Sequence, residues 1–517
     1  MMLLHRYALL AAVLLGAMAA TGFAPLGLWP LTLLGMAGLI ALVERARHAR
    51  TAFLLGWAFG VGHFTVGNNW IAHAFTFQDA MPHWLGYCAV VALALYLALY
   101  PGLAALGLHM AGYRWPGIVK VLLFAALWIV TEYGRATVFT GFAWNPLGMI
   151  WLDTGVDQAS RFIGTYGLSA LAVLGAGALL ALIRQQWHVA GPVLASLGAL
   201  AILGTTSLSG GPRETDIALT VVQPNINQNE KYDPVRETAN FAKLTQLSAA
   251  PAGGAGKPRL IFWPEAAVPA WLDEEPEWRE RLARLLGPGD ALMLGGVKPY
   301  FRVEEKGTYS GRMLIGAANS AWVLAADGHL LARYDKAHLV PYGEYLPMRA
   351  LLEPLGLARL VPGDADFWPG PGPRTLSLPR EATGKPLMMG VQICYEIIFS
   401  GEVADRAVRP DFLYNPSNDA WFGAWGPPQH LAQARMRAIE EALPVIRSTP
   451  TGISAVIDAD GRLLSSIPHH QAGAIQTFLP AAASPTPFAR HGNVMPIIFA
   501  ALLALTAMLL ARGIRAR

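Results

Sequence analysis

Three side chains with complementary chemistry each follow an apolar run of the sequence. Glu265 comes after Leu-Ile-Phe-Trp-Pro, Lys336 lies in Tyr-Asp-Lys-Ala-His, and Cys394 follows Leu-Met-Met-Gly-Val-Gln-Ile. A carboxylate can take the proton of a thiol, the thiolate can attack a carbonyl carbon, and an ammonium can stabilise the oxyanion that develops. Together the three residues would form a complete acyl-transfer apparatus.

Each of these residues also has an ordinary structural interpretation. Most free cysteines behave as small buried hydrophobes, and a lone glutamate or lysine usually lies at the solvated surface. The other cysteine, Cys88, lies within the apolar run Tyr-Cys-Ala-Val-Val. A disulfide framework is therefore not expected, and Cys394 is predicted to be a free thiol.

Other chemical signatures are missing from the sequence. It contains no P-loop, no dinucleotide glycine fingerprint, no Gly-x-Ser-x-Gly elbow, and no His-Glu-x-x-His or paired-cysteine metal motif. We therefore expect neither a cofactor nor a metal ion. The formal charge of +4, without a basic cluster interleaved with aromatic residues, also argues against a nucleic-acid partner.

The three residues belong to a region of about 270 residues in which short apolar runs alternate with helical patterns, which is typical of a layered α/β domain. We place this domain at residues 215–485. The expected strands cover 217–223, 259–263, 291–297, 317–325, 330–334, 387–393, 412–415, 445–449 and 453–458, and the expected helices cover 234–248, 276–286, 396–408 and 428–442.

The remainder of the chain has the composition of a membrane protein. Hydrophobic residues make up 54% and charged residues only 14% of the sequence, and the mean hydropathy is +0.37. Helical spans need roughly 20 apolar residues. The sequence predicts a transmembrane domain at 1–210 and a C-terminal span with its tail at 492–517. The eight expected spans cover 7–22, 29–44, 51–69, 84–112 (one long, kinked or tilted helix, because it contains Pro101), 117–133, 163–183, 189–207 and 493–511.

Basic residues near the ends of these spans indicate the orientation. With the N-terminus inside, the inner segments hold ten lysines and arginines and the short outer loops hold only Arg135 and Arg161. The positive-inside rule then favours both termini in the cytoplasm and the α/β domain outside. In a bacterium that compartment is the periplasm. The apolar, aromatic segment 141–151 is too short to span and is expected at the interface beneath the external domain.

The motifs around the three residues resemble those of the nitrilase superfamily of carbon–nitrogen hydrolases, in which a Glu–Lys–Cys triad occurs in this order. The similarity lies in Trp-Pro-Glu265, Asp-Lys336 with Pro-Tyr-Gly-Glu344, Cys394-Tyr-Glu396, and the segments 415–423 and 434–440. With seven spans before this domain and one after it, the whole chain resembles the bacterial apolipoprotein N-acyltransferase family. That resemblance implies an αββα sandwich outside the membrane.

The resemblance also implies roles for individual residues. Glu265 would be the general base, Cys394 the nucleophile, and Lys336 with the Tyr395 backbone N–H the oxyanion site. Glu344 would orient Lys336 and tune its charge. The other residues in supporting positions would be Tyr395 and Glu396 beside the nucleophile, and Asn319 in Asn-Ser-Ala-Trp.

Aromatic residues are the candidates for substrate binding. The family pattern usually has a tryptophan where this chain has Tyr232, which keeps an aromatic face but differs in size and polarity. Trp421 and Phe422 could belong to a mobile lid that enters the interface, or they could equally be core residues of the domain.

The implied activity is the transfer of an acyl chain from a membrane phospholipid to the N-terminal cysteine α-amine of a diacylated apolipoprotein. We expect a monomer in the bacterial inner membrane. Two other classes remain open. A membrane-tethered amidase would hydrolyse small amides with the same triad, and a transporter with a degenerate external domain would account for the spans but not for the triad.

Overall fold

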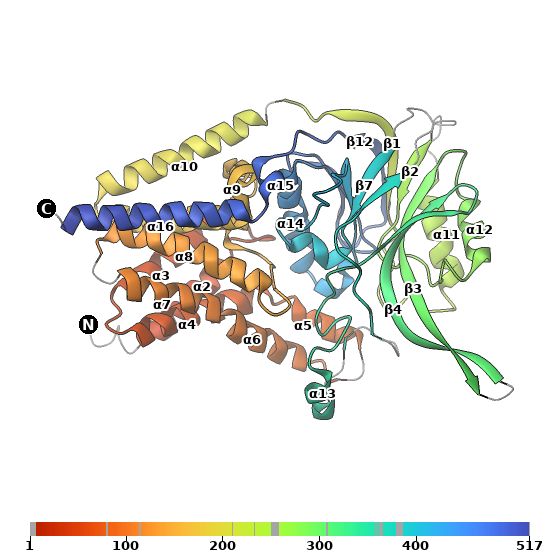
Figure 1. Cartoon of the computed structure of the whole chain (residues 1–517), viewed down its shortest axis with the longest axis horizontal. Helices are drawn as coiled ribbons and strands as arrows, with labels where there is room; N and C mark the ends of the chain where they lie inside the picture. The colour runs from red at the N-terminus through yellow and green to blue at the C-terminus, as the bar shows by residue number, and fades with distance from the viewer. Residues whose placement is uncertain are drawn as a thin grey trace.

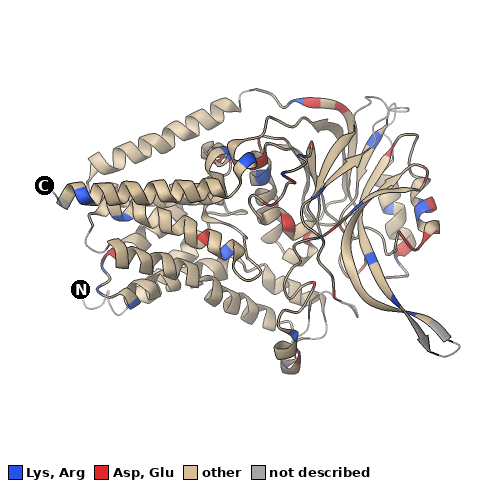
Figure 2. Cartoon of the chain, in the orientation of Figure 1, with Lys and Arg blue, Asp and Glu red and all other residues tan. Residues whose placement is uncertain are grey.

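The computed structural model describes residues 7–78, 81–112, 115–208, 210–231, 233–249, 258–306, 309–356, 359–360, 366–378 and 386–515. A bundle of apolar helices, built from the N-terminal part of the chain and the last helix, lies at one end of the molecule (Figure 1). A domain of sheets and helices lies at the other end. Lysine, arginine, aspartate and glutamate are sparse on the bundle and frequent on the other domain (Figure 2).

Each predicted apolar segment coincides with helix. The helices of the bundle are α2 (Ala8–Ala20), α3 (Trp29–Glu44), α4 (Ala49–Gly67), the short α5 (Ile71–Ala74), α6 (Leu85–Leu97), α7 (Leu99–Gly112), α8 (Gly117–Thr137), α9 (Ser160–Ile183), α10 (Trp187–Ser207) and α16 (Val494–Arg515).

Within the described residues, five helical segments are long and apolar enough to cross a membrane. They are Leu85–Gly112, Gly117–Thr137, Val156–Ile183, Trp187–Ser207 and Val494–Ile514. The helices Ala8–Ala20 and Trp29–Glu44 are apolar but shorter. The protein is therefore embedded in a membrane.

The predicted long fourth segment is one 28-residue apolar stretch that is interrupted at Ala98, between α6 and α7. Pro101 lies three residues further on and has no N–H to donate to the preceding turn. The expectation of a single interrupted helix, rather than two spans with a turn, fits this arrangement.

The other domain contains two six-stranded sheets. The first has the order β12-β1-β2-β3-β4-β5 and the second β11-β10-β9-β8-β7-β6. The strands are β1 (Glu214–Gln223), β2 (Arg259–Phe262), β3 (Ala291–Lys306), β4 (Tyr309–Ala325), β5 (Leu330–Asp335), β6 (Thr375–Leu378), β7 (Leu387–Val391), β8 (Phe412–Pro416), β9 (Val445–Ser448), β10 (Ser454–Ile457), β11 (Leu463–Ile467) and β12 (Gly473–Pro480).

The two sheets contact each other through aromatic side chains of their central strands. The ring of Phe262 in β2 lies 5.9 Å from that of Phe412 and 5.2 Å from that of Tyr414, both in β8. β1, β2 and β3 are parallel neighbours, and so are β7, β8 and β9. Strands of this kind are buried on both faces, which explains their continuous apolar sequences.

Helices cover the sheets. α11 (Glu237–Leu247) and α12 (Pro276–Ala283) lie beside the first sheet, on the side away from the bundle (Figure 1). α14 (Gly426–Glu441) lies between the second sheet and the bundle, and α15 (Pro487–His491) leads into α16. α14 contacts both β9 and α9, so it links the α/β domain to the helix bundle.

Two expectations about elements were wrong. The segment 396–408 is not a helix: a 3₁₀ turn covers Cys394–Ile398, and the chain then continues irregularly through Gly401, whose φ is +77°. A residue in the left-handed region ends a helical run. Strands β6, β11 and β12 were not predicted, and the strands of the β3–β4 hairpin are longer than the predicted 291–297 and 317–325.

Candidate active site

The three candidate catalytic residues lie at the carboxyl ends of central or edge strands. Glu265 follows β2, Lys336 follows β5 and Cys394 follows β7. All are buried, with exposed fractions of 7%, 1% and 5%. Cys394 has a φ of +51°, an uncommon backbone conformation for a residue other than glycine. Such a turn at a strand end projects the thiol away from the sheet.

A hydrogen-bonded network joins the two carboxylates and the ammonium. Lys336 Nζ donates to Glu344 Oε1 over 2.9 Å. Asn319 Nδ2 donates to the same oxygen over 2.9 Å and to Glu265 Oε1 over 2.7 Å. The second carboxylate oxygen, Glu265 Oε2, is buried and has no hydrogen-bond partner among the described residues. It is an available acceptor for a proton.

The charges in this network act on the thiol. Burial and the Glu265 carboxylate raise the pKa of Cys394 well above its usual value, while Lys336 opposes this shift. Burial alone would lower the pKa of Lys336, but the carboxylates of Glu344 and Glu265 raise it above its ordinary value overall. These shifts favour a protonated thiol and a charged ammonium, so attack by sulfur requires a base.

Glu396 ties the nucleophile turn to the lysine loop. Its Oε1 accepts from Tyr334 Oη at 2.8 Å and from the backbone N–H groups of Ala337 at 2.7 Å and His338 at 3.1 Å. Its Oε2 accepts from the Ile393 N–H at 2.7 Å. Burial raises the pKa of Glu396 to about 7 despite these donors. One carboxylate thus fixes the spacing between the segments that carry Lys336 and Cys394.

Tyr395 faces the membrane half. Its hydroxyl lies 3.5 Å from the carbonyl oxygen of Gly141, and its ring packs 5.3 Å from that of Phe399. The segment 141–151 contacts the α/β domain, and it is largely buried. Trp144 Nε1 in this segment donates to Gln429 Oε1 in α14 over 2.7 Å. The site is therefore adjacent to the membrane helices.

The aromatic residues that were predicted to bind substrate differ in burial and in the rings that they contact. Phe422 is buried, with its ring 4.7 Å from Trp70 and 5.4 Å from Trp144. Trp421 is half-buried, with its ring 5.4 Å from Phe77. Both pack against the membrane half in this conformation. Tyr232 lies outside the described residues.

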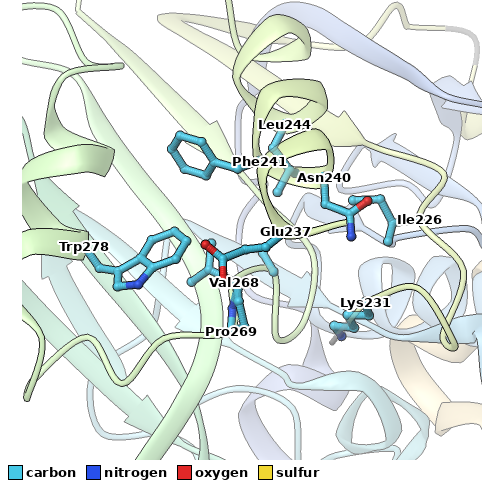
Figure 3. A pocket seen from close by; sticks show the side chains of 10 residues that line it. Ile226, Lys231, Glu237, Asn240, Phe241, Leu244, Val268, Pro269 and Trp278 are labelled. Atoms are coloured by element: carbon cyan, nitrogen blue, oxygen red, sulfur yellow. The ribbon is translucent and has the colours of Figure 1, made fainter. Parts of the chain in front are cut away.

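Lys231 is a residue of the site that the sequence analysis did not select. Its Nζ donates to the backbone carbonyl of Glu265 over 2.9 Å, and burial lowers its pKa to about 8. Figure 3 shows it at the edge of a pocket lined by Phe241, Leu244 and Trp278. The pocket volume of about 20 Å³ has room for about one water molecule, so it cannot hold an acyl chain in this conformation.

A second group of buried residues contacts the backbone of Cys394 through His430. The group consists of Asp419, His430 and Arg447. His430 Nε2 is 3.0 Å from the Cys394 carbonyl oxygen, and its Nδ1 is 3.0 Å from Asp419 Oδ1. Arg447 Nη2 donates to both carboxylate oxygens of Asp419 over 2.7 Å. Asp419 lies in the recognised segment 415–423, but no sequence pattern distinguishes His430 from other residues of an amphipathic helix.

Comparison with known proteins defines the class first. Residues 218–483 match the carbon-nitrogen hydrolase family, and residues 15–178 match the apolipoprotein N-acyltransferase N-terminal domain. The α/β domain thus has a nitrilase-like carbon–nitrogen hydrolase fold with two sheets and helices. Among solved structures, an amidase from Nesterenkonia sp. superposes with a TM-score of 0.33 at 17% identity, covering 53% of this chain and 94% of that chain.

Similarity to full-length proteins extends over both halves. An apolipoprotein N-acyltransferase from Rhodopseudomonas palustris is 33% identical, with 96% of this chain and 94% of that protein covered. One from Caulobacter vibrioides is 37% identical, with 97% and 94% covered. This chain belongs to the apolipoprotein N-acyltransferase family, and it is an acyltransferase.

Proposed function

We propose that the protein transfers a fatty acyl chain from a membrane phospholipid to the α-amine of the N-terminal cysteine of a diacylated apolipoprotein. The observation that carries the proposal is a buried network in which Asn319 and Glu344 join Glu265 to Lys336, together with a buried Cys394 thiol whose pKa is shifted by the charges of Glu265 and Lys336. Family membership supplies the substrate class.

In the first half-reaction, Glu265 Oε2 takes the thiol proton and the Cys394 sulfur attacks the ester carbonyl carbon of the phospholipid. Lys336, together with the Tyr395 backbone N–H, stabilises the oxyanion. The ester C–O bond then breaks, and the lysophospholipid leaves with the proton from Glu265. The acyl chain remains on Cys394 as a thioester.

In the second half-reaction, the lipoprotein amine attacks the thioester carbonyl. Glu265 accepts a proton from the amine, the C–S bond breaks, and the proton returns to sulfur as the amide is released. Glu344 and Asn319 act as positioning residues, because they hold Lys336 and Glu265 in one network. Tyr395 and Glu396 act likewise for the nucleophile turn.

The membrane arrangement follows from the same proposal. We infer eight spans, with a transmembrane domain at 1–210, an αββα catalytic domain at 215–485 in the periplasm, and a C-terminal span at 492–517. Both termini would then lie in the cytoplasm, and the protein would act as a monomer in the inner membrane. The ten-to-two distribution of basic residues supports this orientation.

Substrate contacts are proposed for the aromatic residues near the bundle. Phe422 packs against Trp70 and Trp421 against Phe77, both in the membrane half, which supports the proposal that an acyl chain passes beside them. Movement of these rings would open a path to Cys394 and exclude water afterwards. Tyr232 is proposed to contact the acyl chain or the headgroup.

A direct assay separates this function from amide hydrolysis. Purified enzyme is incubated with phospholipid and a synthetic diacylated lipopeptide, and the peptide mass is followed. The proposal predicts a gain of one acyl chain that is absent in Cys394→Ala. Release of ammonia from small amides, without any change in the lipopeptide, would favour a tethered amidase instead.

A further inference from the structure

The backbone of the nucleophile is strained and needs support. Cys394 adopts a φ of +51°, a region that a residue other than glycine occupies only when its surroundings hold it there. The turn that contains it begins at the end of β7 and continues as the 3₁₀ turn Cys394–Ile398. The orientation of the Cys394 backbone sets the direction of its Cα–Cβ bond.

His430 in α14 contacts this peptide plane directly. Its Nε2 lies 3.0 Å from the Cys394 carbonyl oxygen, and the imidazole is completely buried. A carbonyl oxygen can only accept a hydrogen bond, so Nε2 must carry a proton. The imidazole therefore fixes one side of the nucleophile's backbone.

The other side of the imidazole is held by an ion pair. Arg447 Nη2 lies 3.1 Å from His430 Nδ1 and donates to both oxygens of Asp419 over 2.7 Å. Asp419 Oδ1 lies 3.0 Å from the same ring nitrogen. Burial and the nearby Arg447 lower the pKa of His430, while Asp419 opposes this shift. Both members of the ion pair thus contact Nδ1, and they hold the ring with Nε2 directed at the Cys394 carbonyl oxygen.

We propose that His430 is a positioning residue for acyl transfer, which holds the Cys394 backbone through its carbonyl oxygen, and that Arg447 and Asp419 hold His430 in the orientation in which Nε2 donates to Cys394. This proposal rests on the proposed function of Cys394. A displacement of about 1 Å in a reacting group can cost about 10²-fold in rate. Loss of the His430 contact should therefore slow sulfur chemistry without removing any group that touches substrate.

Two amide substitutions distinguish the contribution of His430 Nε2 from that of His430 Nδ1. In His430→Gln the amide nitrogen reaches the position of Nε2 and can still donate to Cys394. In His430→Asn the amide nitrogen reaches only the position of Nδ1. Gln433→Asn is the matched control, because Gln433 is buried in the same helix and has no hydrogen bond to Cys394.

The readout is the rate of iodoacetamide alkylation of Cys394 in a Cys88→Ala background, with thioester formation from phospholipid measured in parallel. We expect rates within about threefold of the parent for His430→Gln and Gln433→Asn, and a loss of about 10²-fold for His430→Asn. If His430→Asn does not fold, His430→Met, an apolar chain of similar length, takes its place.

Equal rates for His430→Gln and His430→Asn, whether both fast or both slow, would overturn the proposal. Failure of the proposed function has a different signature. In that case Cys394→Ala would still transfer acyl chains, whereas the alkylation rates would still report on the His430 contact.

Discussion

Replacement of Lys336 by methionine removes the ammonium that is proposed to stabilise the oxyanion. The side chain is 1% exposed, and its Nζ donates to Glu344 Oε1 over 2.9 Å. Loss of one oxyanion donor costs about 10²–10³-fold in rate. We therefore expect thioester formation to fall by that factor in Lys336→Met, and by about 10²-fold or more in Lys336→Arg, because the larger planar guanidinium does not fit a compact buried site.

The same change should also destabilise the fold, and this effect must be separated from catalysis. Removing one partner of a buried pair costs about 3–5 kcal/mol. Glu344 keeps donors from Asn319 at 2.9 Å and from the Val340 N–H at 2.8 Å. We therefore expect a loss of stability near the lower end of this range, about 3 kcal/mol. The double variant Lys336→Met, Glu344→Gln removes the unpaired charge. It should regain part of the stability and none of the activity.

The assay is the initial rate of acyl-enzyme formation, measured by intact mass, beside thermal unfolding in the same detergent. Lys298→Met is the matched control, because Lys298 pairs with Asp273 in the same domain and both side chains are 18% exposed. It should leave the rate unchanged, whatever its effect on thermal unfolding. If Lys336→Met is destabilised but forms the acyl-enzyme at a rate within threefold of the parent, Lys336 is a structural ion-pair residue and does not stabilise the oxyanion.

Three other outcomes follow from the site and the orientation. Glu396→Gln replaces an acceptor of four hydrogen bonds by an amide, so thioester formation should fall by about tenfold or more; an unchanged rate would remove Glu396 from the positioning residues. Because burial and Glu265 raise the pKa of Cys394, its thiolate fraction should still increase up to pH 9, and alkylation in a Cys88→Ala background should rise across pH 6–9; a plateau below pH 8 would contradict this. Reporter fusions after Arg184 should report the cytoplasm and fusions at Pro373 the periplasm; a cytoplasmic signal at Pro373 would reverse the orientation.

Strands that are buried on both faces could be predicted most reliably from the sequence. The parallel strands β1, β2, β7 and β8 have continuous apolar runs because both of their faces are covered. The omitted strands β6, β11 and β12 are all edge strands. β11 and β12 are partly exposed, and their mixed sequences resemble those of loops.

Long-range contacts explain the other errors. The residues after Cys394 have helical composition, but Glu396 uses its carboxylate to bind one distant loop and the neighbouring Ile393 N–H, and Gly401 leaves the helical region. The contacts of His430 and Lys231 bring together segments that are far apart in the chain. Residue types in a single sequence contain no signal for such contacts, whereas Glu265, Lys336 and Cys394 could be selected by their motifs.

The central claim is that the acyl chain passes through Cys394, and the most direct measurement is the mass of the enzyme after incubation with phospholipid alone. We expect a gain of one acyl chain on the peptide that contains Cys394, its release by neutral hydroxylamine, and its disappearance on addition of a diacylated lipopeptide. Cys394→Ala should show no adduct, Glu265→Gln should form it slowly, and Cys88→Ala should match the parent. Acyl transfer at full rate in Cys394→Ala, or an adduct found only on Cys88, would contradict the account.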